Sequence, residues 1–260
     1  MDMLDLLDRL DAKRMWDEEP VFCFTSDVDW ASEAVLQEFL ADFRMCKLPL
    51  TVFVTHESKI VNKYKEEGLI ERGIHPNFLA DSSHGEGLRT VIETCIKFAP
   101  EATGYRSHRL FDVSDVSHLL HDEYGFKYVS NLGTIMQTRI RPILHESGLV
   151  HFPIFFEDGV HLRNRMGFDL SAYLSRFESP GIKIISVHPM NYVVNTPEID
   201  YMRKIKDTLS RQEYNTISAE EIGQRHYAGL GTKNLVEEIV SLAGRHSIVK
   251  LSELYEMAVS

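Results

Sequence analysis

Short apolar runs alternate with amphipathic segments along the whole chain. Compact runs of β-branched, aromatic and aliphatic residues predict buried strands, and apolar residues spaced three and four apart predict helices. The predicted strands are 21–25, 50–54, 69–74, 102–105, 128–130, 150–156, 182–187 and 248–249. The predicted helices are 3–15, 32–43, a polar segment ending at Gly68, 88–96, 113–123, 169–177, most of 198–244, and 252–258.

Individual residues mark the ends and interruptions of several elements. Ser32 can cap the helix that follows it, and Gly68 suits the position after a helix. Pro153 lies inside the 150–156 run, and proline has no N–H to donate to a neighbouring strand. We therefore do not expect this strand to be paired throughout as a central strand.

Strands that are separated by helices imply parallel pairing, because a parallel connection needs a long crossover. About seven or eight such units fit a distorted (β/α) barrel in a single domain over residues 1–260. A doubly wound open sheet is the alternative. Residues 1–19 supply a lead-in helix. We expect the helical stretch 198–244 to be an insertion or outer packing. The alternatives are that it forms a lid or an interface.

Composition places the chain among ordinary globular proteins and narrows its partners. Hydrophobic residues make up 43% of the sequence, and 28 Lys and Arg against 39 Asp and Glu give a formal net charge of −11. This charge disfavours nucleic acid and anionic membranes as partners. No apolar run approaches the roughly 20 residues of a membrane span. We expect no secretory signal, because the first residues have no basic stretch and no long apolar core. Three cysteines without metal-binding spacing favour a reducing compartment, so we expect a cytoplasmic protein. The oligomeric state stays open.

Polar side chains follow seven consecutive predicted strands. The carboxyl ends of parallel strands meet at one rim, which is where barrels bind their ligands. The residues at these ends are Asp27, Asp29, His56, Glu57, His75, Arg106, His108, Asn131, Glu157, Asp158 and His188. We expect several of them to share one pocket.

Asp27 and Asp29 carry the sharpest signal. In an extended segment, residues i and i+2 share a face, so both carboxylates can point into the same pocket. Two adjacent carboxylates raise one pKa unless a cation compensates them. This favours Asp29 as a metal ligand and Asp27 as a general base. The alternative is that Asp29 helps to start the helix near Ser32 and Asp27 closes a turn.

Two histidines after the third strand are candidate metal ligands. His75 precedes Pro76, which favours an extended backbone, and His84 lies nine residues farther on. A loop of this length can bring both imidazoles to one ion. Asp29, His75 and His84 would leave open positions for water, as a catalytic Zn²⁺ site requires. A structural role for His75 and helix capping by His84 are the alternatives.

His188 and Arg106 complete the candidate machinery. Imidazole is suited to general acid catalysis near neutral pH, and a guanidinium can orient a carboxylate or bind substrate. A hydrogen-bonded core histidine and a surface ion pair are the respective alternatives. The remaining candidates, for contact with substrate, are His108, Glu157, Asp158, Trp30 and Asn131. For Glu157 and Asp158, the alternative is that they orient His188.

The candidate residues fall in a series of short motifs. These are Thr25-Ser26-Asp27-Val28-Asp29, Thr51-Val52-Phe53-Val54, Gly73-Ile74-His75-Pro76-Asn77-Phe78 with Ser83-His84-Gly85, Gly104-Tyr105-Arg106-Ser107-His108, Ile185-Ser186-Val187-His188-Pro189, and 247–254. In this order they resemble the polysaccharide deacetylase family (NodB homology, carbohydrate esterase family 4), and most closely its branch associated with lipopolysaccharide O-antigen biosynthesis. The resemblance extends over roughly residues 20–258.

The resemblance implies a distorted (β/α)₇ barrel and metal-dependent removal of acetyl groups from N-acetylated sugars. It gives Asp27 the base role, Asp29 and His75 the metal role, Arg106 the role of steadying the base, and His188 that of general acid.

The sequence departs from the family pattern at three positions. Val28 separates two aspartates that are adjacent in the family, and Leu79 stands where the family has its second metal-binding histidine. We therefore expect His84 to be the third ligand. His108 stands where the family usually has proline, and it gains a possible role toward substrate.

The resulting hypothesis is a metal-dependent carbohydrate N-deacetylase, a hydrolase of a linear amide C–N bond. Its substrate would be an N-acetylated sugar of a bacterial surface polysaccharide of the O-antigen type, or its precursor. The cofactor would be one divalent ion, zinc first, with nickel, cobalt or another ion open. The alternatives are a glycoside hydrolase with a carboxylate pair on a related barrel and a non-catalytic sugar-binding or assembly protein.

Overall fold

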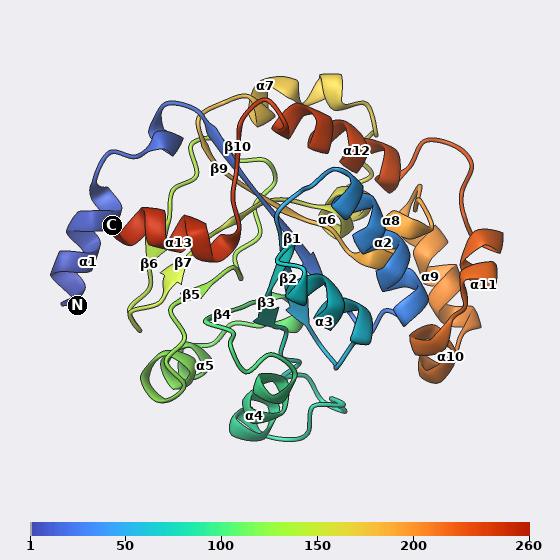
Figure 1. Ribbon diagram of the computed structural model, residues 1–260, viewed down its shortest axis with the longest axis horizontal. Coiled ribbons are helices and arrows are strands. Elements are labelled where there is room, and N and C mark those ends of the chain that lie inside the picture. The colour runs from blue at the N-terminus through green and yellow to red at the C-terminus, as the bar shows by residue number, and fades with distance from the viewer. Residues whose placement is uncertain (1) are drawn as a thin grey trace.

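The structure, a computed structural model, describes residues 2–260 and is built on one ten-stranded sheet (Figure 1). The strands follow the order β6-β7-β5-β4-β3-β2-β1-β9-β8, and β10 pairs with β1. Only the β6–β7 pair, within the described residues, is antiparallel. The strands are β1 (Pro20–Asp27), β2 (Leu50–Val54), β3 (Ile70–Ile74), β4 (Gly104–Tyr105), β5 (Tyr128–Val129), β6 (Ile143–Leu144), β7 (Val150–His151), β8 (Ile154–Glu157), β9 (Gly181–Ser186) and β10 (Ser247–Ile248).

The sheet closes on itself through a single interrupted strand. β7 pairs with β5 and β8 pairs with β9, yet only Phe152 and Pro153 separate β7 from β8. The interruption falls where Pro153 cannot donate a hydrogen bond, as the sequence predicts. On either side of it, the Phe152 N–H donates to the Val129 carbonyl (2.8 Å) and the Ile154 N–H to the Leu132 carbonyl (2.7 Å).

With β7 and β8 counted as one, seven parallel strands surround the core in addition to β10. The predicted distorted (β/α)₇ barrel is therefore confirmed, and the open doubly wound sheet is excluded.

Helices cover the outside of this sheet (Figure 1). They are α1 (Met3–Asp11), α2 (Glu33–Met45), α3 (Lys59–Glu66), α4 (Leu88–Phe98), α5 (Ser114–His118), α6 (Asp158–Arg163), α7 (Leu174–Phe177), α8 (Pro189–Val193), α9 (Ile199–Thr208), α10 (Arg211–Thr216), α11 (Ala219–Gln224), α12 (Thr232–Ala243) and α13 (Leu251–Val259). Shorter helical turns are η1 (Met15–Asp17), η2 (His108–Leu110), η3 (Leu119–Glu123) and η4 (Leu170–Ala172).

Local chemistry explains where the helices start and which face they bury. Ser32 caps α2 by accepting a hydrogen bond from the Val35 N–H (3.3 Å), and Ser58 caps α3 in the same way. α2 buries the apolar face that the sequence predicts. The sequence pattern missed β6, α6 and α8, which are too short to produce a periodic signal.

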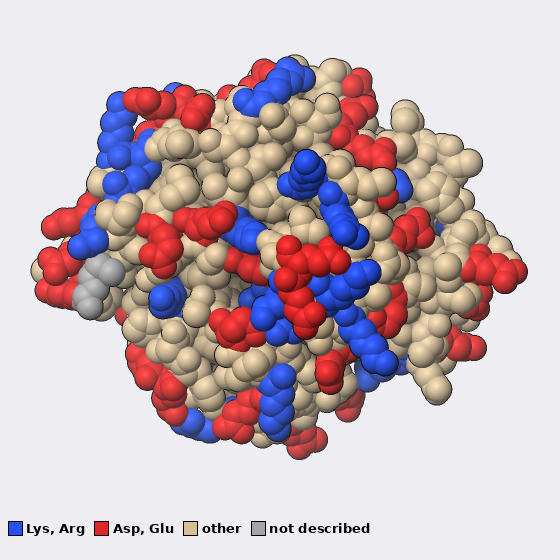
Figure 2. All heavy atoms as spheres, in the orientation of Figure 1, with Lys and Arg blue, Asp and Glu red and all other residues tan. Residues whose placement is uncertain are grey.

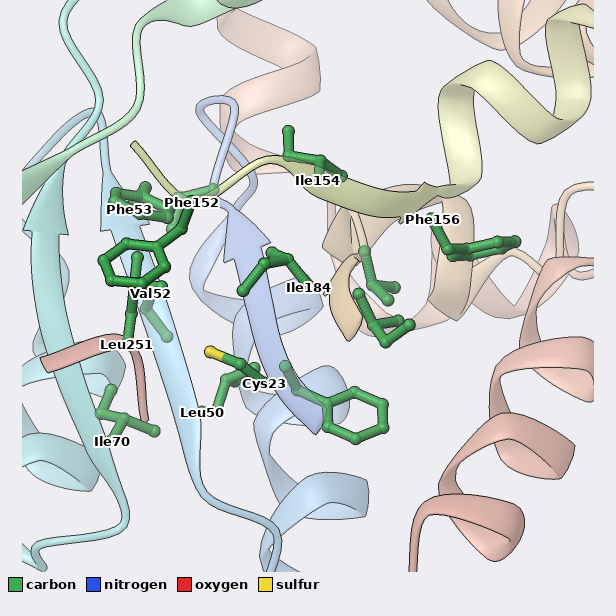
Figure 3. Packing of buried hydrophobic residues seen from close by; sticks show 14 of the residues in the cluster. Cys23, Leu50, Val52, Phe53, Ile70, Phe152, Ile154, Phe156, Ile184 and Leu251 are labelled. Atoms are coloured by element: carbon green, nitrogen blue, oxygen red, sulfur yellow. The ribbon is translucent and has the colours of Figure 1, made fainter. Parts of the chain in front are cut away.

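The core lies inside the closed sheet, and β1 is its central strand. All eight residues of β1 are buried, because β2, β9 and β10 flank it. Figure 3 shows Cys23 of β1, Leu50 of β2 and Ile184 of β9 packed together in this interior. The buried apolar cluster extends from Leu6 in α1 to Val259 in α13. This packing holds the carboxyl ends of the strands, and the polar residues that follow them, in fixed positions.

Candidate active site

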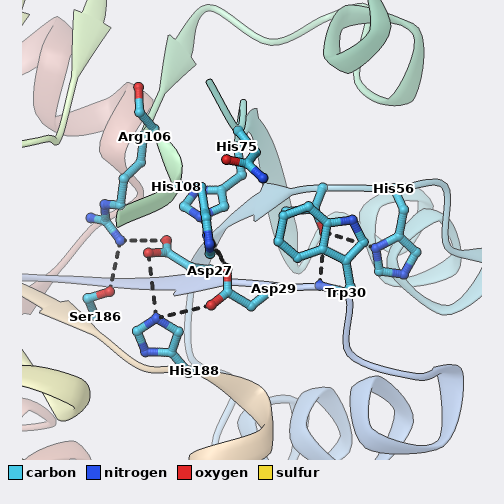
Figure 4. Close-up of polar contacts among 12 residues, drawn as sticks. Asp27, Asp29, Trp30, His56, His75, Arg106, His108, Ser186 and His188 are labelled. Atoms are coloured by element: carbon cyan, nitrogen blue, oxygen red, sulfur yellow. Dashed lines mark hydrogen bonds and ion pairs between the residues drawn. The ribbon is translucent and has the colours of Figure 1, made fainter. Parts of the chain in front are cut away.

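Arg106, which directly follows β4, is the most heavily bonded side chain of the site. It is completely buried and donates from Nη1 to Asp27 Oδ1 (2.8 Å), Thr25 Oγ1 (2.9 Å) and Ser186 Oγ (2.9 Å). Nε and Nη2 donate to the carbonyl and the hydroxyl of Ser130. One guanidinium thus joins the ends of β1, β5 and β9. Figure 4 shows its contacts with Asp27 and Ser186.

The partner carboxylate, Asp27, is held in its charged form. Burial favours the neutral acid, but the charges of Arg106, His75 and His188 together outweigh it, so the pKa of Asp27 is lowered. Asp27 is therefore a carboxylate at neutral pH. It lines the cavity described below, where it can accept a proton.

Three residues from neighbouring strand ends form a candidate metal centre. Asp29 Oδ1 lies 2.9 Å from His108 Nδ1 and 3.3 Å from His75 Nε2 (Figure 4). One ligand atom from each of these residues lies within 4.8 Å of the other two. His75 follows β3 and is buried, whereas Asp29 and His108 are partly exposed. The three side chains therefore meet at the barrel rim.

The donor set of this group fits a divalent ion. Burial opposes the charge on Asp29, but hydrogen bonds from His108 and His75, together with the charge of His188, hold its pKa well below the usual range. One carboxylate and two imidazoles are the ligand types of catalytic zinc sites, which keep a further position open. The group accordingly has the charge and the donor atoms that such an ion requires.

Unusual backbone conformations place two of these ligands. Asp29 and Trp30 have φ values of +46° and +57°, and Arg109 and Leu110, which follow His108, have +56° and +53°. Left-handed residues other than glycine are uncommon and cost of order 1–3 kcal/mol each where the conformation is strained. The surrounding structure must supply this energy, which is typical of functional sites.

The premise of an extended segment through both aspartates is wrong, because β1 ends at Asp27 and the backbone turns at Asp29. The carboxylates nevertheless come together. His188 Nε2 lies 4.0 Å from Asp27 Oδ2 and 3.8 Å from Asp29 Oδ2. The two carboxylates therefore meet because the backbone turns at Asp29, and not because residues i and i+2 of a strand share a face.

His84 is not part of the metal-ligand group, in contrast to the sequence-based expectation. Its Nδ1 accepts a hydrogen bond from the Asn77 N–H (3.1 Å) and contacts Cys95 Sγ, and its Nε2 lies 2.8 Å from the Thr55 carbonyl oxygen. Burial lowers the pKa of His84, so the ring is neutral and donates from Nε2. Both ring nitrogens are occupied in bracing the loop, and His108 takes the place expected for His84.

His188 is held by a buried carboxylate. Asp158 Oδ1 lies 2.5 Å from His188 Nδ1, and Asp158 Oδ2 accepts from the His188 N–H (2.9 Å) and from Asn191 Nδ2 (3.2 Å). Burial disfavours the imidazolium, but the charge and hydrogen bond of Asp158, with Asp29 and Asp27, raise the pKa of His188 well above 6.5. His188 therefore carries a proton at neutral pH and presents Nε2 to the two aspartates.

Asp158 and Glu157 separate into two roles that the sequence left open. The Asp158 side chain is fully buried against His188, so it takes the orienting role. The expectation that Asp158 contacts substrate is wrong, because its side chain does not reach the cavity. Glu157 lines the cavity, and its Oε2 has no hydrogen-bond partner. Burial raises the pKa of Glu157, which favours the neutral acid there. Glu157 is thus available to a ligand.

Asn131 braces the loop that carries His108, whereas Trp30 packs against the His108 ring and lines a neighbouring cavity with Asp29 and His108. Asn131 accepts a hydrogen bond from the Ser107 N–H (3.0 Å) and donates one to the Phe111 carbonyl (2.8 Å), so it fixes both ends of the turn that contains His108. It does not line the cavity, so the expectation that it contacts substrate is wrong. Trp30 donates from Nε1 to Ser83 Oγ (3.1 Å), and its ring lies edge-on to His108 with 5.1 Å between centroids.

A cavity of about 550 Å³ opens above these groups. Asp27, Asp29, His75, His108, Glu157 and His188 line its inner part. One wall comes from α9, and Tyr214 of α10 adds to it. Part of the 198–244 region therefore borders the site, which goes beyond the outer packing expected for it.

Comparison with known proteins assigns the family. A family model described as WbmS-like polysaccharide deacetylase matches residues 24–206, which is more than half of the chain. The chain belongs to this family. Its matched segment includes every residue placed in the site above except Tyr214. No curated protein matches the sequence.

A solved structure with a TM-score of 0.74 shows the same fold. The chain is similar to a crystal structure of a predicted polysaccharide deacetylase involved in O-antigen biosynthesis, WbmS from Bordetella bronchiseptica, with 22% identity, a TM-score of 0.74, and coverage of 85% of this chain and 90% of that one. A structure of the peptidoglycan deacetylase PdaC from Bacillus subtilis matches with 13% identity, a TM-score of 0.45 and 92% coverage of both chains. Among the described residues, no helix has the length and apolar character of a membrane span.

The buried ion pair makes a prediction about stability. Replacing Arg106 by Ala should lower the free energy of unfolding by about 3–5 kcal/mol, because Asp27 would be left as a buried charge without a partner. Chemical denaturation measures the change. Arg89→Ala, which breaks the exposed pair with Glu123, is the control and should have a much smaller effect. Equal stability of the two variants would contradict the role given to Arg106.

Proposed function

We propose that this protein is a metal-dependent carbohydrate N-deacetylase that removes the acetyl group from an N-acetylated sugar of an O-antigen-type polysaccharide or its precursor. The observation that carries the proposal is the Asp29–His75–His108 group, which lies beside an oriented carboxylate and an oriented imidazolium in one cavity. Membership of the family supports the reaction class. The description of the similar Bordetella protein supports the O-antigen context.

Asp29, His75 and His108 would hold the divalent ion, with zinc as the first candidate and nickel or cobalt as others. An ion bound there would act as a Lewis acid toward the amide carbonyl and toward water. The assignment of His108 replaces that of His84, whose nitrogens are engaged elsewhere.

Asp27 would be the general base. Arg106 keeps it ionised and fixes one of its oxygens, while the other faces His188 across 4.0 Å. The carboxylate would take a proton from the water that attacks the acetamide carbonyl carbon. Because Arg106 is itself held by three strands, Asp27 needs no rearrangement to do so.

His188 would be the general acid. An amine leaves as a neutral molecule only if its nitrogen is protonated as the C–N bond breaks. The imidazolium, held by Asp158, supplies that proton from Nε2. The products are acetate and a free amino sugar. Glu157, whose Oε2 has no partner within the protein, would hydrogen-bond a sugar hydroxyl at the cavity wall.

We also propose that residues 1–260 form one catalytic domain in the cytoplasm. The single apolar cluster from α1 to α13 supports one domain. Cys23, Cys46 and Cys95 are free thiols in the structure, which suits a reducing compartment.

The base assignment predicts the result of one substitution. Asp27→Asn keeps the size of the side chain and removes its basicity, so acetate release from N-acetylated sugars should fall at least about a hundredfold. Asp5→Asn, an exposed change in α1, should leave turnover unchanged. A carboxylate-pair glycosidase would instead release a reducing sugar without acetate, and a binding protein would keep its function in Asp27→Asn. Either result would refute the proposal.

The ligand assignment predicts the metal content of variants. The purified protein should contain about one divalent ion per chain, and His75→Ala and His108→Ala should lose it because each removes one donor. His84→Ala should retain the ion. Elemental analysis by mass spectrometry measures the metal content per chain. It is applied only to variants whose circular dichroism spectrum shows an intact fold. Retention in His108→Ala together with loss in His84→Ala would contradict the assignment.

The Asp158–His188 pair predicts a pH dependence. The protonated imidazole is the active form, so activity persists below the pKa of His188 and falls as the pH rises through it. Because that pKa is raised, the fall should come well above pH 6.5. Asp158→Asn removes the largest charge that raises it, so the alkaline limb of kcat should move to lower pH. An unchanged limb in Asp158→Asn would exclude His188 as the acid.

A further inference from the structure

The outer wall of the cavity is cationic. α9 directs Ile199, Met202, Arg203 and Lys206 toward it, a spacing of three, four and seven residues that places them on one helix face. Arg163, the last residue of α6, and Arg109, beside the ligand His108, add two further cations. All four cationic side chains belong to exposed residues, so they surround the entrance rather than the interior.

Three of these cations are not neutralised by the protein. Arg203 forms an ion pair with Asp200, but within residues 2–260 no carboxylate lies within ion-pair distance of Arg109, Arg163 or Lys206. Lys206 instead lies over the ring of Tyr214, 5.7 Å from its centroid. This is unexpected in a chain with a net charge of −11. On the face drawn in Figure 2, basic and acidic side chains are interspersed.

The carboxylates of the inner part of the cavity, in contrast, already have partners. Asp27 faces Arg106 and His188, and Asp29 faces His75, His108 and His188. The anionic end of a ligand would therefore bind best to the unpaired cations at the entrance, which leaves its neutral end for the inner part. An acetamide is neutral, so the inward end matches the group that the proposed reaction consumes.

We propose, on the basis of the deacetylase function above, that the substrate is a sugar diphosphate ester, and that Arg109, Arg163 and Lys206 bind its diphosphate. A diphosphate carries at least two negative charges, which matches several unpaired cations better than a neutral polysaccharide does. Arginine offers a planar fork that binds phosphate oxygens bidentately, and lysine adds a point charge. The enzyme would then act on an activated or carrier-linked monomer, before polymerisation.

Two sources would provide the same diphosphate chemistry, a nucleoside diphosphate sugar and a polyprenyl diphosphate sugar. Isothermal titration of the purified protein with inorganic pyrophosphate, UDP and farnesyl diphosphate distinguishes them. Binding of pyrophosphate and UDP supports a nucleotide carrier, and preferential binding of farnesyl diphosphate supports a lipid carrier. In both cases the affinity should fall as the salt concentration rises.

Matched variants test whether the cationic wall is responsible. Arg163→Gln and Lys206→Gln should each weaken diphosphate binding roughly three- to tenfold. Lys204→Gln, an exposed change on the same helix that does not line the cavity, should leave binding unchanged. The same measurements in His75→Ala exclude direct binding of the probe to a metal.

The proposal is overturned if no diphosphate probe binds the wild-type protein. It is also overturned if Arg163→Gln and Lys206→Gln bind as tightly as Lys204→Gln. Its failure is separable from that of the deacetylase function, because binding needs no turnover. Acetate release from a neutral methyl glycoside of an N-acetylated sugar, without diphosphate binding, would reject the anionic substrate alone.

Discussion

The buried ion pair between Arg106 and Asp27 is the constraint on which the site depends. A guanidinium without exposure to water must find acceptors for its donors, and here they come from the ends of β1, β5 and β9. Removing a charged pair from water costs several kcal/mol per ion, so the pair persists only because every partner is in place. The strand ends that meet in the closed barrel are therefore the ones that hold Asp27, the proposed base, in place.

Burial and neighbouring charges also give adjacent titratable groups of the site different protonation states. Asp27 and Asp29 stay ionised because cations and imidazoles lie against them, whereas Glu157 is driven toward the neutral acid by burial. His188 keeps its proton because Asp158 lies behind it. One site can hold both a base and an acid at the same pH because the surroundings of its titratable groups move their pKa values apart. The strained turns at Asp29 and Arg109 aim the ligands into this arrangement.

Much of the fold could be predicted from the sequence because parallel strands are continuous apolar runs. The run 182–187 and the strand 50–54 correspond closely to β9 and β2, and Pro153 marks the interruption where the sheet closes. The rule that ligands gather at strand ends also placed Asp27, His75, Arg106 and His188 together, since it depends on topology and not on loop conformation.

The errors concern loops and short helices. His84 was expected to reach the metal group, but left-handed turns at Asp29 and after His108, which no sequence period reveals, bring His108 there instead. The burial of Asp158 depends on how α6 leaves β8, and that is a property of packing. The hydroxyls of Thr25, Ser130 and Ser186 that hold Arg106 were also missed, although their position near the ends of strands offered a signal. The contribution of α9 to the cavity was likewise not predicted from its otherwise ordinary amphipathic pattern.

The central claim is that distant strand ends converge on one divalent ion. Anomalous X-ray diffraction from crystals of the metal-loaded protein, recorded at the absorption edge of the bound element, locates that ion directly. The account predicts one peak bonded to Asp29 Oδ1, His75 Nε2 and His108 Nδ1 at roughly 2.0–2.2 Å. A peak coordinated by His84 in place of His108, or an ion bound away from these three residues, would contradict it.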